Sequence, residues 1–97
     1  MPAKKKRPVI VRTYSAGVHY GYLVEQSTDG KRVVLEKSRR IWYWTGAASL
    51  SQLAVDGPKA GSKIGVPIRV EVTEAIEIID CEQAAVTAIE GMASWRA

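Results

Sequence analysis

The sequence has little of the side-chain chemistry on which disulfides, metal sites and nucleophilic catalysis depend. Among 97 residues there is one cysteine, Cys81, and one histidine, His19. A single cysteine excludes an internal disulfide, and the two residues together are too few for a zinc site. A chain without disulfides fits a reducing, intracellular compartment. No glycine-rich phosphate loop and no serine–histidine–aspartate pattern is present, so we expect no enzyme, no metal and no cofactor.

Long apolar runs are also missing. No stretch reaches the ~18 apolar residues that suggest a transmembrane helix, and no apolar run of signal-peptide length follows the basic N-terminus. We therefore expect a soluble protein that has no membrane partner. The composition, 46% hydrophobic and 25% charged, is that of one small folded domain. Its modest core would gain stability from a homo-oligomer.

Charge is distributed unevenly along the chain. The net charge of +4 comes from four residues near the N-terminus, Lys4, Lys5, Lys6 and Arg7, and residues 8–97 are neutral. We interpret residues 1–7 as a flexible basic arm that precedes a single domain over residues 8–97. Such an arm is either a nucleic-acid contact or a solvated terminus. Within the domain, residues 8–47 are positive and residues 48–97 are negative.

Alternating and β-branched residues predict a sheet of about six strands. The predicted strands cover residues 9–14, 18–26, 32–36, 39–44, 68–72 and 75–79. Gly21 lies inside the second strand and predicts a bulge or a close approach of two backbones. We expect the sheet to be antiparallel and either twisted or partly closed as a small barrel.

Two helices complete an α+β order of ββββ-α-ββ-α. A short middle helix is predicted over residues 50–55, with Thr45 or Ser49 as its N-cap, and a C-terminal helix over residues 82–92, with Asp80 as its N-cap. The glycine-rich residues between the middle helix and the fifth strand form the longest predicted loop. Trp95, beyond the last helix, is expected to fold back on the sheet.

The segment from Arg39 to Ala47 combines arginines with large aromatic residues. Tryptophan and arginine most often carry binding energy at protein surfaces. Strand alternation places Arg40, Trp42 and Trp44 on one face. They form either a ligand or partner surface or, for the tryptophans, a second small core under the middle helix. Together with neighbours from the first two strands, the candidate binding residues are Arg12, Tyr14, His19, Arg39, Arg40, Trp42 and Trp44.

Other reactive residues favour structural roles. His19 has no carboxylate placed to orient its ring, so we interpret it as a binding contact or a structural histidine rather than a general base. Cys81, at a strand-to-helix junction, is interpreted as a buried structural thiol. A run of acidic residues predicts a solvated acidic face rather than a metal site: Glu71, Glu74, Glu77, Asp80 and Glu82.

Three segments resemble a family of small proteins encoded by tailed bacteriophages and prophages. They are RTYSAGVHYG over residues 12–21, RRIWYWTGAASLSQLA over residues 39–54, and TEAIEII over residues 73–79. The resemblance covers residues 8–95 and excludes the basic arm. The family has no known activity, so the resemblance implies a phage setting and supplies no catalytic residues. Small phage proteins of this kind commonly block a host defence component, sequester a nucleotide signal or join the virion.

These observations predict a non-enzymatic phage binding protein in the host bacterial cytoplasm. We expect it to inhibit host antiviral defence by sequestering a nucleotide second messenger or by blocking a host defence protein. One alternative is a nucleic-acid-binding accessory protein that uses the basic arm. Another is a virion or assembly component whose arm contacts a second subunit.

Overall fold

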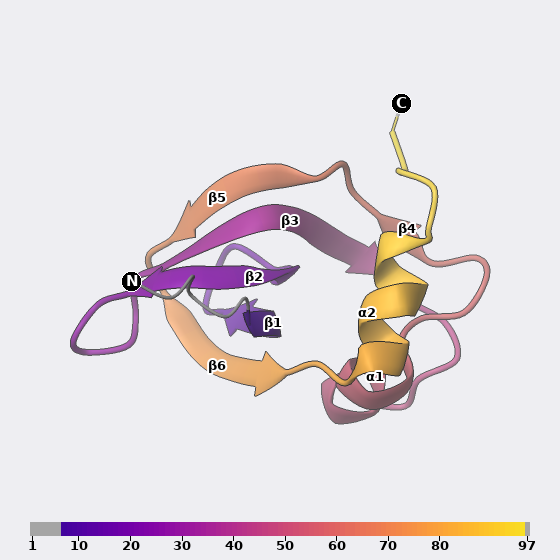
Figure 1. Ribbon diagram of the computed structural model, residues 1–97, viewed down its shortest axis with the longest axis horizontal. Helices are drawn as coiled ribbons and strands as arrows, with labels where there is room; N and C mark the ends of the chain where they lie inside the picture. The colour runs from indigo at the N-terminus through magenta and orange to yellow at the C-terminus, as the bar shows by residue number, and fades with distance from the viewer. Residues whose placement is uncertain (1–6, 97) are drawn as a thin grey trace, which may run out of the picture.

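A curved antiparallel sheet with two helices at one end makes up the protein in the computed structural model, which describes residues 7–96 (Figure 1). The six strands are β1 (Arg7–Thr13), β2 (Val18–Gln26), β3 (Val33–Tyr43), β4 (Lys63–Ile64), β5 (Ile68–Val72) and β6 (Ala75–Asp80). The helices are α1 (Leu50–Asp56) and α2 (Gln83–Glu90). The α+β class and the twisted antiparallel sheet predicted from the sequence are confirmed.

The strand order places the first strand, β1, between β2 and the last strand, β6. The order is β4-β3-β2-β1-β6, and β5 pairs with β3 beside β4. The consecutive strands β5 and β6 therefore lie at opposite edges, above and below the other strands in Figure 1. Two residues, Thr73 and Glu74, join them. So short a link reaches from one edge to the other only because the sheet curls.

Both faces of the sheet carry a hydrophobic core, which explains why Val9, Ile10 and Val11 are all fully buried. Successive residues of a strand point to opposite faces. Ile10 belongs to a helix-side core with residues of β2, β3, β4, α1 and α2. Val9 and Val11 belong to an inner core with residues of β3, β5 and β6. The two faces of the sheet are accordingly the helix-side face and the inner face.

A β-bulge at Lys37 interrupts the regular alternation of β3. Tyr20 of β2 pairs with Arg39 and Tyr22 pairs with Glu36, so three steps along β3 oppose two along β2. Lys37 has a φ of 51°, the left-handed conformation that bulges often contain. Before the bulge Leu35 faces the inner core, and after it the odd-numbered Ile41 faces the helix-side core.

The bulge accounts for one incorrect boundary in the sequence prediction. The strands predicted over residues 32–36 and 39–44 are one continuous strand, β3, whose change of face resembled a break between two strands. The prediction for Gly21 is confirmed, since the register shifts beside it. A Cβ atom at Gly21 would lie 3.0 Å from Leu35 Cβ and 3.2 Å from Ser38 Cα, so only glycine fits easily against the bulge.

The helices begin close to where the sequence predicts. Ser49 is the N-cap of α1, and its hydroxyl accepts a hydrogen bond of 3.2 Å from the backbone N–H of Gln52. Asp80 is not the N-cap of α2, contrary to prediction. Its carboxylate accepts from Arg7 at 2.7 Å at the end of β6, and Glu82 precedes the helix instead. The predicted long loop contains the short strand β4, which pairs with the end of β3.

The basic arm is mostly beyond what the structure describes. Lys4, Lys5 and Lys6 lie outside the described residues. Arg7, which the sequence analysis assigned to the arm, is the first residue of β1 and forms an ion pair with Asp80. Neither α1 nor α2, the helices found within residues 7–96, is long and apolar enough to cross a lipid bilayer.

The bulge residue provides a test of this fold. A β-branched side chain is strongly disfavoured at positive φ, whereas glycine is not. We expect Lys37→Val to lower the free energy of unfolding by about 1–2 kcal/mol and Lys37→Gly to leave it unchanged or raise it. Both variants lose the same lysine charge, so urea unfolding of the pair isolates the backbone effect. Equal midpoints for the two variants would contradict the bulge.

Candidate functional site

Two adjacent pockets lie along the last part of β3, and Arg40 and Trp42 line both of them. The narrow pocket has a volume of about 200 Å³, and its other lining residues are His19, Ser38, Gly65, Val66 and Ile68. The wide pocket has a volume of about 450 Å³, and its other lining residues are Ser15, Ala16, Gly17, Val18, Ile41 and Trp44. We call the two pockets together the Arg40–Trp42 groove.

Strand register brings the narrow pocket together. His19 on β2 lies directly opposite Arg40 on β3 and opposite Val11 on β1, so all three side chains share the inner face. The bulge at Lys37 places Ser38 on the same face, two residues before Arg40. The segment after β4 closes the other side, because the Gly65 N–H donates a hydrogen bond of 2.8 Å to the Arg40 carbonyl.

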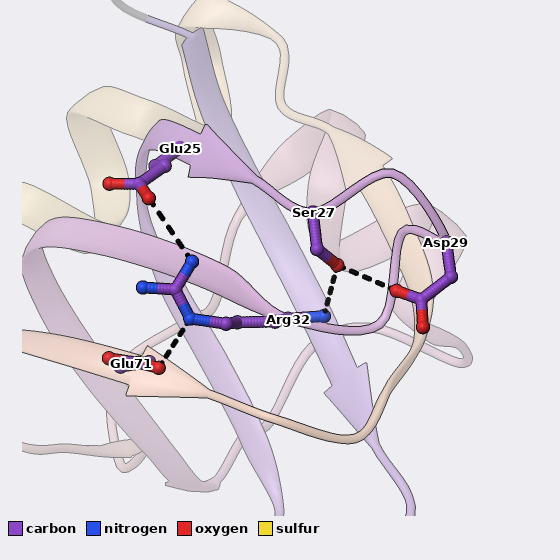
Figure 2. A network of polar contacts seen from close by, with 5 residues as sticks. All are labelled: Glu25, Ser27, Asp29, Arg32 and Glu71. Carbon is purple, nitrogen blue, oxygen red and sulfur yellow. Dashed lines mark hydrogen bonds and ion pairs between the residues drawn. The ribbon is translucent and has the colours of Figure 1, made fainter.

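Arg40 differs from the other arginines between residues 7 and 69 because its guanidinium has neither a hydrogen-bond acceptor nor a carboxylate within 4.0 Å. Figure 2 shows the contrasting case of Arg32, whose Nε donates to Glu71 at 2.5 Å and whose Nη1 donates to Glu25 at 3.1 Å. Arg7, Arg12 and Arg69 each lie within 4.0 Å of a carboxylate.

The Arg40 guanidinium instead lies 5.2 Å from the centre of the Trp42 ring, which is a cation–π contact. This contact holds the side chain in place and leaves its N–H donors available. Trp42 is itself 56% exposed. A cation with free donors beside an open indole is suited to bind an anionic group next to a flat one.

His19 adds no charge to the narrow pocket. Burial, and second the nearby Arg40 guanidinium, lower the pKa of His19 below its usual range. Its Nε2 lies 3.0 Å from the Ala16 carbonyl, which can only accept, so Nε2 carries the proton and donates it. The imidazole is therefore neutral at pH 7, and Arg40 is the charged side chain of this pocket.

Ser38 lines the narrow pocket and is not among the binding residues predicted from the sequence. It is 1% exposed, and its Oγ has no hydrogen-bond partner in the structure. A buried polar atom without a partner costs about 1–3 kcal/mol, so such atoms call for an explanation. No sequence signal marks Ser38, because its position in the pocket depends on the bulge one residue earlier.

A second aromatic residue extends the groove at its rim. Trp95 contacts Trp42 edge to face, with ring centres 6.1 Å apart, and the Lys63 ammonium lies 5.1 Å from the Trp95 ring. The backbone N–H of Trp95 donates to the Ile64 carbonyl of β4, so the expectation that Trp95 folds back on the sheet is confirmed. Both tryptophans remain about half exposed.

The predicted binding residues separate into two groups. The groove brings together His19, Arg40, Trp42 and Trp44. Trp44 also packs against the helix-side core, as its interpretation as a core residue near the middle helix predicts, and its role in binding stays a prediction. Arg12 lies elsewhere, opposite Val18 and 3.5 Å from Glu77 of β6, and Tyr14 is 79% exposed without lining either pocket.

Arg39 is buried and is not a residue of the groove. It is 4% exposed and faces α2, on the side of the sheet opposite Arg40. Its Nε donates to the Gly65 carbonyl at 2.8 Å, and its Nη1 donates to the Ile89 carbonyl at 2.5 Å. A cation at the end of α2 also suits the negative end of the helix dipole. Arg39 therefore joins α2, the sheet and the segment after β4.

The remaining candidates show no arrangement for chemistry. Burial raises the pKa of Cys81 to about 12, which fits an unreactive structural thiol. Glu71, Glu77 and Asp80 are exposed and form ion pairs with arginines. Within residues 7–96, no three histidine, cysteine or acidic residues are close enough to hold a metal ion.

A family model described as a domain of unknown function, DUF6948, matches the chain over residues 6–89. The match includes β1 to β6 and nearly all of α2, and the protein belongs to this family. Among curated proteins and solved structures, the comparisons found no match.

The neighbouring arginines of β3 should differ sharply in their effect on stability. Arg39→Ala removes the donors from two buried carbonyls, so we expect it to lower the free energy of unfolding by about 3 kcal/mol. Arg40→Ala removes a half-buried side chain without an acceptor and should cost less than about 1 kcal/mol. Chemical denaturation of both variants measures the difference. Equal losses would show that Arg39 does not hold α2 and the sheet together.

The only histidine of the chain also predicts a pH dependence of stability. Because its folded pKa is lowered, the unfolded chain binds a proton first as pH falls through the ordinary pKa of about 6.5. The free energy of unfolding should therefore decrease as the pH is lowered, by at most about 1.4 kcal/mol per pH unit. In His19→Gln, whose amide can still donate to Ala16, the decline between about pH 7.5 and 5.5 should be smaller. Urea unfolding across this range tests it, and identical slopes would contradict a neutral buried imidazole.

Proposed function

We propose that this protein is a non-enzymatic binding protein whose Arg40–Trp42 groove takes a ligand with a flat ring and an anionic group, which is the chemistry of a nucleotide. The main observation in support is the Arg40 guanidinium, which has no acceptor and rests beside an exposed indole between two pockets. A phosphate accepts paired hydrogen bonds from a guanidinium. Stacking of a base on an aromatic ring contributes about 1–3 kcal/mol.

The phage setting implied by the sequence resemblance supports a more specific form of the proposal. In that setting the protein is encoded by a bacteriophage, acts in the host bacterial cytoplasm and inhibits antiviral defence by sequestering a nucleotide second messenger. A groove of this size is open to solvent on a single chain. Homo-oligomer formation would enclose the ligand further and make sequestration more complete.

The exposed pair of Trp42 and Trp95 supports a second candidate function, which is to block a host defence protein. Half-exposed tryptophans that contact each other, with Arg40 and Lys63 beside them, have the composition of a binding hot spot. In this case the same surface meets a protein rather than a small molecule. Loss of binding in Trp95→Ala, together with no response to nucleotides, would favour this candidate.

Calorimetric titration against cyclic dinucleotides, ADP-ribose derivatives and mononucleotides tests the first candidate. We expect at least one of them to bind, and Arg40→Ala to weaken that binding at least about tenfold. The matched control is Arg69→Ala, because Arg69 is an exposed arginine of the sheet that lies 4.0 Å from Glu36 and outside the groove. Absence of heat with every compound, or equal losses in the two variants, would overturn the nucleotide proposal.

The basic arm requires its own test, since a nucleic-acid role remains the alternative from the sequence. Deleting residues 1–6 removes Lys4, Lys5 and Lys6 and keeps the Arg7–Asp80 ion pair. We expect binding of the small ligand to survive this deletion. Binding of DNA or RNA that declines steeply with salt and disappears with the arm would instead support the accessory role.

A further inference from the structure

The unpartnered hydroxyl of Ser38 indicates how the groove divides a ligand between its two pockets. We infer that the narrow pocket receives the uncharged hydrogen-bonding edge of a heterocyclic base, with Ser38 as the specificity-determining residue, while the phosphate stays at Arg40 on the side of the wide pocket. This inference rests on the proposed function, since it assigns the parts of the same ligand.

The chemistry of the narrow pocket favours a neutral guest. Ser38 Oγ can donate and accept, and no protein atom uses either capacity. The His19 imidazole is neutral, and its Nε2 proton is already bound by the Ala16 carbonyl. Val66, Ile68 and the Trp42 ring supply apolar walls. A flat ring with one polar edge would bury apolar surface against these walls and supply the partner that Ser38 lacks.

A phosphate would fit the narrow pocket poorly. It needs several donors in place of the water it loses, and apart from Arg40, which the wide pocket shares, Ser38 would provide only one beside apolar walls. The wide pocket has more than twice the volume, about 450 Å³ against about 200 Å³, and adjoins the Ser15–Gly17 turn. Arg40 lines both pockets, so its guanidinium can hold a phosphate outside while the attached ring enters the narrow pocket.

Substitution of Ser38 separates a binding role from a structural one. Ser38→Ala removes a buried hydroxyl that has no partner, so the fold should be at least as stable as the wild type. If Ser38 reads the base, the same variant should bind its best nucleotide about tenfold more weakly. A residue that merely fills space would not combine unchanged stability with lost selectivity.

The experiment compares wild type, Ser38→Ala and Arg40→Ala. Each is titrated with the 5′-monophosphates of adenosine, guanosine, cytidine and uridine and with inorganic phosphate, and each urea midpoint is measured. We expect the wild-type protein to bind the four nucleotides with different affinities. Ser38→Ala should lose these differences while its affinity for inorganic phosphate is unchanged. Arg40→Ala should bind every compound more weakly, including phosphate. The Ser38→Ala midpoint should not fall.

The outcomes distinguish this inference from the function on which it rests. If wild type binds none of these compounds, the base subsite is overturned, and the function is overturned with it when the cyclic dinucleotides and ADP-ribose derivatives also give no heat. If Arg40→Ala abolishes binding while Ser38→Ala keeps the wild-type ranking, the function stands and the base subsite is wrong. A clear fall in the urea midpoint of Ser38→Ala would show that the hydroxyl holds a structural water, which also overturns the inference.

Discussion

The extra residue in β3 is the constraint on which both the cores and the groove depend. With regular alternation, Arg39 and Ile41 would face the inner core with Leu35, and Arg40 and Trp42 would face the helices. The bulge at Lys37 reverses this assignment halfway along the strand. A single strand can then contribute Leu35 to one core and Ile41 to the other. A lysine at positive φ costs about 1 kcal/mol, which is small beside the burial that the reversal allows.

The two arginines that follow the bulge show how burial and hydrogen bonding decide the role of a residue. The Arg39 guanidinium donates to two backbone carbonyls and so stabilises the fold. The Arg40 guanidinium has no acceptor, so its donors remain available to a ligand. Their roles are connected through Gly65. Its carbonyl accepts from Arg39 and its N–H donates to the Arg40 carbonyl, so the wall of the narrow pocket is fixed before any ligand arrives.

Local patterns were sufficient to predict much of the sheet and part of the site. Alternation gave β2 with its observed bounds and placed Arg40 and Trp42 on one face. Of the two predicted caps of α1, Thr45 and Ser49, the structure shows Ser49. Prediction failed where a distant partner decides the outcome. Arg12 was predicted to neighbour the binding segment of β3, but it forms an ion pair with Glu77 of β6 instead.

The other failures have the same origin. Asp80 has the composition of an N-cap, but its carboxylate is taken by Arg7 from the opposite end of the chain. The positive φ of Lys37 moves Ser38 and Arg39 to the faces opposite those that regular alternation predicts. A lysine in the sequence does not indicate this conformation. Two features could therefore not be predicted from local sequence patterns. They are the pairing of strands that are far apart in sequence and a positive φ at a residue other than glycine.

The position of β1 between β2 and β6 has a consequence for the order in which the chain acquires its structure. β1 is the earliest strand within residues 7–96, yet it pairs on one side with β6, the last. The inner core requires Val72 and Ala75, and the helix-side core requires Val86 and Ile89. The inner core therefore cannot close before Ala75 has been synthesised, nor the helix-side core before Ile89. Closure of both cores thus depends on contacts between residues that are distant in sequence, which favours slow folding.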